Sequence, residues 1–150
     1  MSEQMFRMFE LAQQGFYCSQ ILLLLGLEAQ GKDNPDLIRA MSGLAGGLGF
    51  SSQTCGALTG GACLLGLYAG KGTPGENEHP RFQIMVNELV DWFKEEVGSS
   101  CGGINCEDIL GEDLQYKVVS VQCGNIVSST YEKVREILIN NEIDFDEARE

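Results

Sequence analysis

Between Ala40 and Gly70 the chain carries no charged side chain, although the protein as a whole has a formal net charge of −12. Residues 54–66 of this run read TCGALTGGACLLG, an apolar stretch that predicts one buried helix. Its glycines and alanines recur four residues apart and therefore line narrow stripes of that helix. Each interior glycine costs up to about 1 kcal/mol of helix stability relative to alanine. Because the chain accepts this cost several times in one helix, we expect another group to lie close to the helix backbone along these stripes.

Two interpretations of these stripes remain open. In the first, neighbouring helices pack tightly around a glycine-rich central helix. In the second, a ligand approaches the helix backbone. Under either interpretation Gly56 and Gly60 should lie against another helix backbone or a redox site, with no room for a side chain, and we predict them as cofactor-binding positions.

The rest of the hydrophobic pattern predicts an all-α fold, because apolar residues recur at helical spacing in most segments. Helices are expected at about residues 2–14, 18–27, 34–45, 54–70 and 80–98, and, after a short turn at 107–110, over a long segment that includes 123–138. Ser2 and Asn34 are predicted N-caps, and Pro35 suits the first helical position because its missing N–H costs nothing there. The glycine-rich residues 99–106 are predicted as a loop. Alternating β-branched residues occur at 116–123, and they can equally pack one helix face.

The length favours one domain over residues 1–150. We predict a single-domain bundle of about six helices around the glycine-rich helix. The acidic residues 142–150 are expected to fray or to dock only through Ile143 and Phe145.

Composition excludes several classes of function. A pI near 4.4 and the absence of clustered Lys and Arg oppose binding to nucleic acid or to an anionic membrane surface. The longest apolar stretches fall short of the roughly 20 residues of a membrane-spanning helix. Because the opening MSEQMFRMFE has no features of a signal peptide, we expect a cytoplasmic protein with reduced thiols.

The six cysteines fall into two groups. Cys18, Cys55, Cys106 and Cys123 each lie at or within one turn of a predicted helix start, where the helix dipole and unpaired N–H groups favour the thiolate and should lower the thiol pKa. Cys63 lies inside a helix and is predicted as a core residue. Cys101 lies in the predicted loop, where it could act as an auxiliary thiol. Buried, inert thiols remain the alternative for any one of them.

No C-x-x-C pair occurs, which weighs against a thioredoxin motif, a zinc ribbon and c-type haem attachment. A Cys-His catalytic pair is disfavoured because the single histidine, His79, is remote in sequence from every cysteine. The adjacent acids Glu95 and Glu96 are interpreted as a hydrated helix face.

The order of the cysteines resembles the C_GCAxxG_C_C family of redox-active proteins. Four segments, spread from about Gly15 to Leu138, carry the resemblance: GFYCSQILLLLGL, AGGLGFSSQTCGALTGGACLLGLYAG, VGSSCGGINCEDILGEDL and QCGNIVSSTYEKVREIL. This chain reads Cys55-Gly56-Ala57 where the family label places glycine before cysteine. A similar helical module occurs beside haem in split-Soret cytochromes. The resemblance implies redox chemistry at Cys18, Cys55, Cys106 and Cys123, with Cys63 and Cys101 as additional cysteines.

Three functions therefore stand as hypotheses. The first is a redox protein whose four family cysteines converge, as metal ligands, on an iron-sulfur cluster for electron transfer, either as an oxidoreductase or as an electron carrier. The second is a metal-free thiol-disulfide protein that uses two of the same residues. The third is a helical binding or assembly module with inert thiols. We expect a redox partner protein, and the sequence is also compatible with a homodimer. Neither nucleic acid nor a membrane is expected as a partner.

Overall fold

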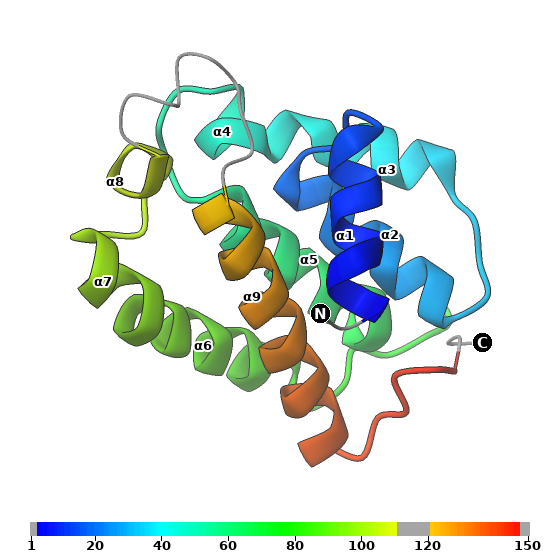
Figure 1. Cartoon of the computed structure of the whole chain (residues 1–150). Helices are drawn as coiled ribbons and strands as arrows, with labels where there is room; N and C mark the ends of the chain where they lie inside the picture. The colour runs from blue at the N-terminus through cyan, green and yellow to red at the C-terminus, as the bar shows by residue number, and fades with distance from the viewer. Residues whose placement is uncertain (1–2, 111–120, 148–150) are drawn as a thin grey trace.

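The protein is all-α, as the hydrophobic pattern predicted (Figure 1). The computed structural model describes residues 3–110 and 121–147. Its elements are α1 (Glu3–Gln13), α2 (Cys18–Ala29), α3 (Pro35–Met41), the 3-10 turn η1 (Ser42–Leu44), α4 (Ala45–Leu48), α5 (Gly56–Ala69), α6 (Phe82–Phe93), the π-helical turn η2 (Lys94–Gly98), α7 (Ser99–Cys101), α8 (Cys106–Leu110) and α9 (Val121–Asn140).

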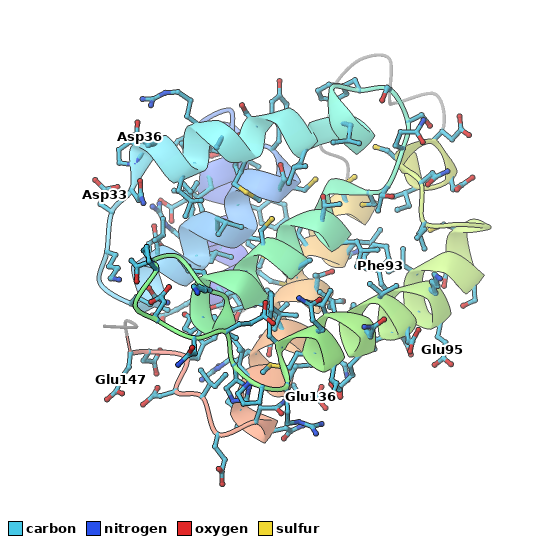
Figure 2. The ribbon with its side chains drawn as sticks, turned by 180° about the vertical axis from the view of Figure 1, so that it is seen from behind. Asp33, Asp36, Phe93, Glu95, Glu136 and Glu147 are labelled. Atoms are coloured by element: carbon cyan, nitrogen blue, oxygen red, sulfur yellow. The ribbon has the colours of Figure 1, made fainter. Side chains whose placement is uncertain are left out.

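The core is built around the apolar helix α5, which packs against α2, α6 and α9 (Figures 1 and 2). Leu64 and Leu65 of α5 are fully buried, as are Leu22 of α2, Phe93 of α6 and Val134 of α9. Figure 2 shows Phe93 directed into the bundle and Glu95, two residues further on, directed away from it. Burial of these side chains from four helices joins the segments into one core.

The end of the third predicted helix differs from the expectation. Asn34 caps α3 as predicted, since its Oδ1 accepts the Leu37 N–H at 3.1 Å. The helix nevertheless ends at Met41 and continues only as η1. The backbone then turns left-handed at Gly46 and Gly47, where φ is 64° and 74°, a conformation that glycine adopts without steric cost. The predicted Ser2 cap lies outside the described residues.

The fifth predicted helix is shifted toward the C-terminus. It begins at Phe82 rather than Pro80, passes through η2 and α7, and therefore extends beyond Gly98 into the predicted loop. Gly98 keeps helical angles of φ −60° and ψ −41°, whereas Gly102 has φ 83° and ends the helix. The difference has a simple cause, because Gly98 keeps helical angles and lets the helix continue, whereas Gly102 adopts the left-handed conformation that commonly ends a helix.

The described part of the C-terminal segment docks through Phe145, which is 3% exposed. Its ring stacks on Tyr68 at 5.0 Å between centroids and meets Tyr131 edge-on at 5.3 Å. The Tyr68 hydroxyl donates a hydrogen bond of 2.6 Å to the Phe145 carbonyl. Ile143 also packs against the core. The alternating segment 116–123 falls outside the described residues except for its last three, which begin α9. No described helix is both long enough and apolar enough to span a bilayer.

Candidate functional site

The first two turns of α5 lie directly against the start of α2. A Cβ atom built on Gly60 would stand 3.0 Å from the Cα of Ser19 and 3.2 Å from its carbonyl oxygen. A Cβ on Gly56 would stand 2.9 Å from the Sγ of Cys18. The prediction that these glycines have no room for a side chain is therefore confirmed. The close approach also places the Cys18 sulfur on the first turn of α5, beside Cys55.

A short pairing of extended backbone holds Cys55 next to Cys106. The Cys55 N–H donates to the Ile104 carbonyl at 2.9 Å, and the Cys106 N–H donates to the Gln53 carbonyl at 2.8 Å. Thr54 and Asn105 form the antiparallel bridge between these bonds. Because side chains alternate along paired strands, the two cysteines lie on the same face as diagonal neighbours, for which Cα atoms are roughly 7–8 Å apart. Nothing in the sequence pattern signalled this pairing.

Three of the four family cysteines lie at helix starts. Cys18 is the first residue of α2, Cys55 is the N-cap of α5 and Cys106 is the first residue of α8, whereas Cys123 is the third described residue of α9. Cys55, Cys106 and Cys123 are buried, and Cys18 keeps partial exposure.

The four family cysteines would repel one another if their thiols were ionised. Burial raises the pKa of Cys18 well above its ordinary value, and the negative charges of Cys55, Cys123 and Cys106 raise it further. Burial likewise raises the pKa of Cys55 to about 12, and the charges of Cys123 and Cys106 contribute to the rise. The pKa of Cys106 is raised to about 11 by burial and then by Cys123. Because charges shift one another's pKa values only over short separations, these cysteines are neighbours in the fold.

The direction of these pKa shifts corrects the sequence-based expectation. Helix starts were expected to lower the thiol pKa values, and the backbone N–H groups of Ala57 and Leu58 do act in that direction on Cys55. Burial and the neighbouring thiolates outweigh them, so the pKa rises. The sequence indicates where a helix starts. It does not indicate how deeply a cysteine is buried or which other cysteines the fold places beside it.

The two additional cysteines lie elsewhere. Cys63 is exposed, so its prediction as a core residue was wrong. Because the residues of α5 are apolar on every side of the helix, the sequence could not indicate which side α2, α6 and α9 leave exposed to solvent. Cys101 ends α7 and is half-buried. It lines a groove beside α9 that the sequence did not reveal.

The four family cysteines offer only sulfur donors to a metal. Among the residues that the structure describes, no group of three or more His, Cys, Asp or Glu side chains has the compact arrangement that holds a metal ion. The ligands of an iron-sulfur cluster stand further apart than those of one ion, because they are shared among two or four iron atoms. Four thiols without histidine or carboxylate are the donor set of such a cluster.

Comparison with known proteins gives one match. A family model described as "Putative redox-active protein (C_GCAxxG_C_C)" matches residues 16–137. Neither the curated proteins nor the solved structures include a match.

Proposed function

Because the chain belongs to the C_GCAxxG_C_C family of redox-active proteins, we propose that it transfers electrons through an iron-sulfur cluster held by Cys18, Cys55, Cys106 and Cys123. The observation that carries the proposal is the packing of the Cys18 sulfur against the first turn of α5, where the bridge between Thr54 and Asn105 also holds Cys55 near Cys106. The pKa values of Cys18 and Cys55 respond to Cys123 as well. When bound, such a cluster stores one electron by a change of iron valence.

The raised pKa values favour a cluster over free thiols. At pH 7 a thiol with a pKa of about 11 is ionised in only about one molecule in ten thousand. Thiol-disulfide exchange needs the thiolate, so Cys55 and Cys106 would be slow nucleophiles. If Cys18, Cys55, Cys106 and Cys123 held a cationic iron centre, its positive charge would offset the burial and the mutual repulsion of their thiolates, and these cysteines would bind in the deprotonated form.

The backbone N–H groups would then support the bound sulfurs. Those of Ala57 and Leu58 are directed at Cys55, and that of Ser19 is directed at Cys18. Hydrogen bonds to ligating sulfurs and low solvent exposure are two features by which a protein sets the potential of a cluster. In this proposal, Gly56 keeps the first turn of α5 open beside the Cys18 sulfur.

A metal-free dithiol mechanism is the second candidate, and the bridge between residues 53–55 and 104–106 supports it because it keeps Cys55 and Cys106 close together. Diagonal neighbours have Cα atoms roughly 7–8 Å apart, so a disulfide between them would require the two backbone segments to move closer. An assembly module is less well supported. In an assembly module, the glycine stripes of α5 would have to face a partner protein. Here Gly56 and Gly60 face α2 instead. Gly61 faces Thr130 of α9 and Leu89 of α6.

Anaerobic reconstitution distinguishes these functions. The reduced protein would be treated with ferrous iron and sulfide, desalted, and assayed for iron, sulfide and visible charge-transfer absorption. We expect stoichiometric iron and sulfide in the wild type and in Cys63→Ser, and a large loss in Cys→Ser variants at positions 18, 55, 106 and 123. Equal iron content in all variants, or none in the wild type, would overturn the cluster proposal.

The same samples test the dithiol function. If iron is absent, titration of the protein against a thiol redox buffer with mass spectrometry should show the loss of two hydrogen atoms, as two protons and two electrons taken up by the buffer, and this loss should map to Cys55 and Cys106. The protein would be expected to exchange electrons with a redox partner protein in the cytoplasm, where reduced thiols persist.

A further inference from the structure

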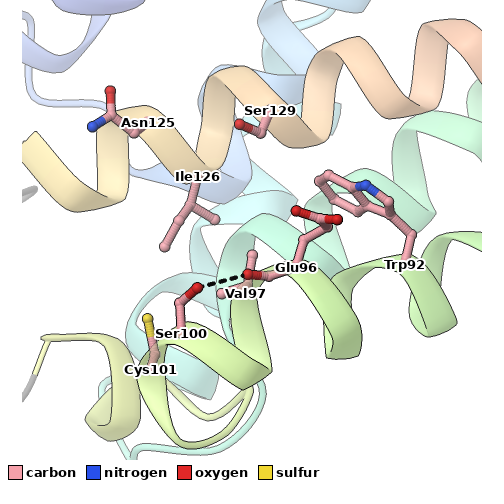
Figure 3. A pocket seen from close by; sticks show the side chains of 8 residues that line it. All are labelled: Trp92, Glu96, Val97, Ser100, Cys101, Asn125, Ile126 and Ser129. Carbon is pink, nitrogen blue, oxygen red and sulfur yellow. Dashed lines mark hydrogen bonds between the residues drawn. The ribbon is translucent and has the colours of Figure 1, made fainter.

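A groove runs between the C-terminal half of the α6–η2–α7 helix and the first turns of α9 (Figure 3). Trp92, Glu96 and Cys101 lie on one wall, and Asn125, Ile126 and Ser129 lie on the other. The groove has a volume of about 240 Å³ and is open to solvent along Glu96, Ser100, Asn125 and Ser129, so it admits a small, narrow ligand that stays partly exposed. Figure 3 shows Trp92 and Glu96 toward one end and Cys101 at the other.

The π-helical turn η2 shapes one wall of this groove. It spans Lys94–Gly98 and contributes Glu96 and Val97. Ser100 follows on the same wall, where its hydroxyl donates to the Glu96 carbonyl at 3.0 Å. Single π-helical turns inside α-helices occur frequently at functional sites. Here the turn directs the Glu96 carboxylate toward α9, whereas Figure 2 shows Glu95 on the outer side of the helix.

The chemistry of the groove favours a cationic ligand with hydrogen-bonding groups. The Glu96 carboxylate attracts a cation, and the half-buried indole of Trp92 offers a π-face to the same charge. Asn125 and Ser129 supply polar groups on the opposite wall. Lys133, one turn beyond Ser129 on α9, lies 3.4 Å from Glu136, so its charge is offset by a neighbouring carboxylate. The net charge of −12 adds a field of the same sign as Glu96.

We propose that this groove binds a low-molecular-weight disulfide bearing primary amines, and that Cys101 exchanges with it. One ammonium group lies at Trp92 and Glu96, and the disulfide reaches Cys101 at the other end. The Cys101 thiol gives its proton to solvent, and the thiolate attacks one sulfur of the ligand. A Cys101–sulfur bond forms as the ligand disulfide breaks, and one aminothiol leaves. Cys101 is thereby oxidised to a mixed disulfide and the departing half of the ligand is reduced. This proposal is independent of the cluster.

Cystamine is the probe for the covalent step. It carries an ammonium group at each end, and it can be compared with neutral bis(2-hydroxyethyl) disulfide. The rate of mixed-disulfide formation at Cys101 would be measured by acid quench and peptide mass spectrometry. The same reaction in urea gives the intrinsic ratio of the two reagents. We expect the native protein to prefer cystamine by several-fold more than the unfolded chain does.

Two matched variants assign the preference to the groove. Glu96→Gln should reduce the preference about two- to fivefold, the effect of losing a partly hydrated ion pair. Glu95→Gln removes the same charge from the neighbouring residue outside the groove and should leave the preference unchanged. Equal effects of the two variants would mean that only the overall field attracts the reagent. An unchanged preference in Glu96→Gln would also overturn the proposal.

A non-covalent measurement separates binding from reactivity. Trp92 is the only tryptophan in the sequence, so its fluorescence reports on the groove alone. Hexane-1,6-diamine, which resembles cystamine without the disulfide, should change the emission saturably and slow the alkylation of Cys101. Hexane-1,6-diol should do neither. A diamine that leaves both the emission and the alkylation rate unchanged would refute the assignment.

Discussion

Replacing Gly60 by Ala tests whether α2 and α5 pack backbone against backbone. The new Cβ would lie 3.0 Å from the Cα of Ser19 and 3.2 Å from the Cδ1 of Leu22. Carbon atoms in contact prefer about 3.5–4.0 Å, so the helices must move apart by several tenths of an ångström. Overpacking of this kind costs about 1–3 kcal/mol, and the better helix propensity of alanine returns about 0.5–1 kcal/mol. We therefore expect a net loss of roughly 0.5–2 kcal/mol.

Gly124→Ala is the matched control for this change. Gly124 lies in α9, and a Cβ built there meets no atom of the described residues 3–110 and 121–147 within 4 Å. Propensity alone should then stabilise the protein by about 0.5–1 kcal/mol. Urea unfolding of both variants, as reduced metal-free protein, gives the two free energies by linear extrapolation. If Gly60→Ala gains as much stability as Gly124→Ala, the explanation of why α5 is rich in glycine is wrong.

Three further measurements test the surroundings of the site. Because the pKa of Cys106 is about 11 and that of Cys55 about 12 in the fold, against about 8.5 for unfolded thiols, metal-free protein should keep its stability below pH 8.5 and lose it as the pH rises toward 11. Urea unfolding at pH 7, 8.5 and 10 should show this loss, and Cys106→Ser should make it shallower. Iodoacetamide at pH 8 should alkylate exposed Cys63 well before Cys55 or Cys106 in native protein, as peptide mass spectrometry would show, whereas equal rates would contradict their burial. Tyr68→Phe should cost about 1–2 kcal/mol in thermal unfolding, because it leaves the buried Phe145 carbonyl without its 2.6 Å hydrogen bond, and an unchanged stability would show that the C-terminal segment is not anchored there.

Local chemistry in the sequence determined the helices. The apolar spacing predicts α2, α5 and the described part of α9, because side chains three and four residues apart share a helix face whatever the fold around them. The cap at Asn34 depends only on its own side chain and the N–H three residues on, so it could also be predicted. The placement of Cys18, Cys55 and Cys106 at helix starts follows from the same local signals.

Tertiary structure decided what those cysteines experience. The bridge between Thr54 and Asn105 joins segments about fifty residues apart in sequence through backbone groups, which are the same in every residue and leave no sequence signal. The exposure of Cys63 depends on which face of α5 its neighbours leave uncovered. The pKa values depend on burial and on charges from other helices, whereas the helix-start effect is local and weaker. Local rules could therefore locate the thiols, but only the packing of distant helices could set their ionisation.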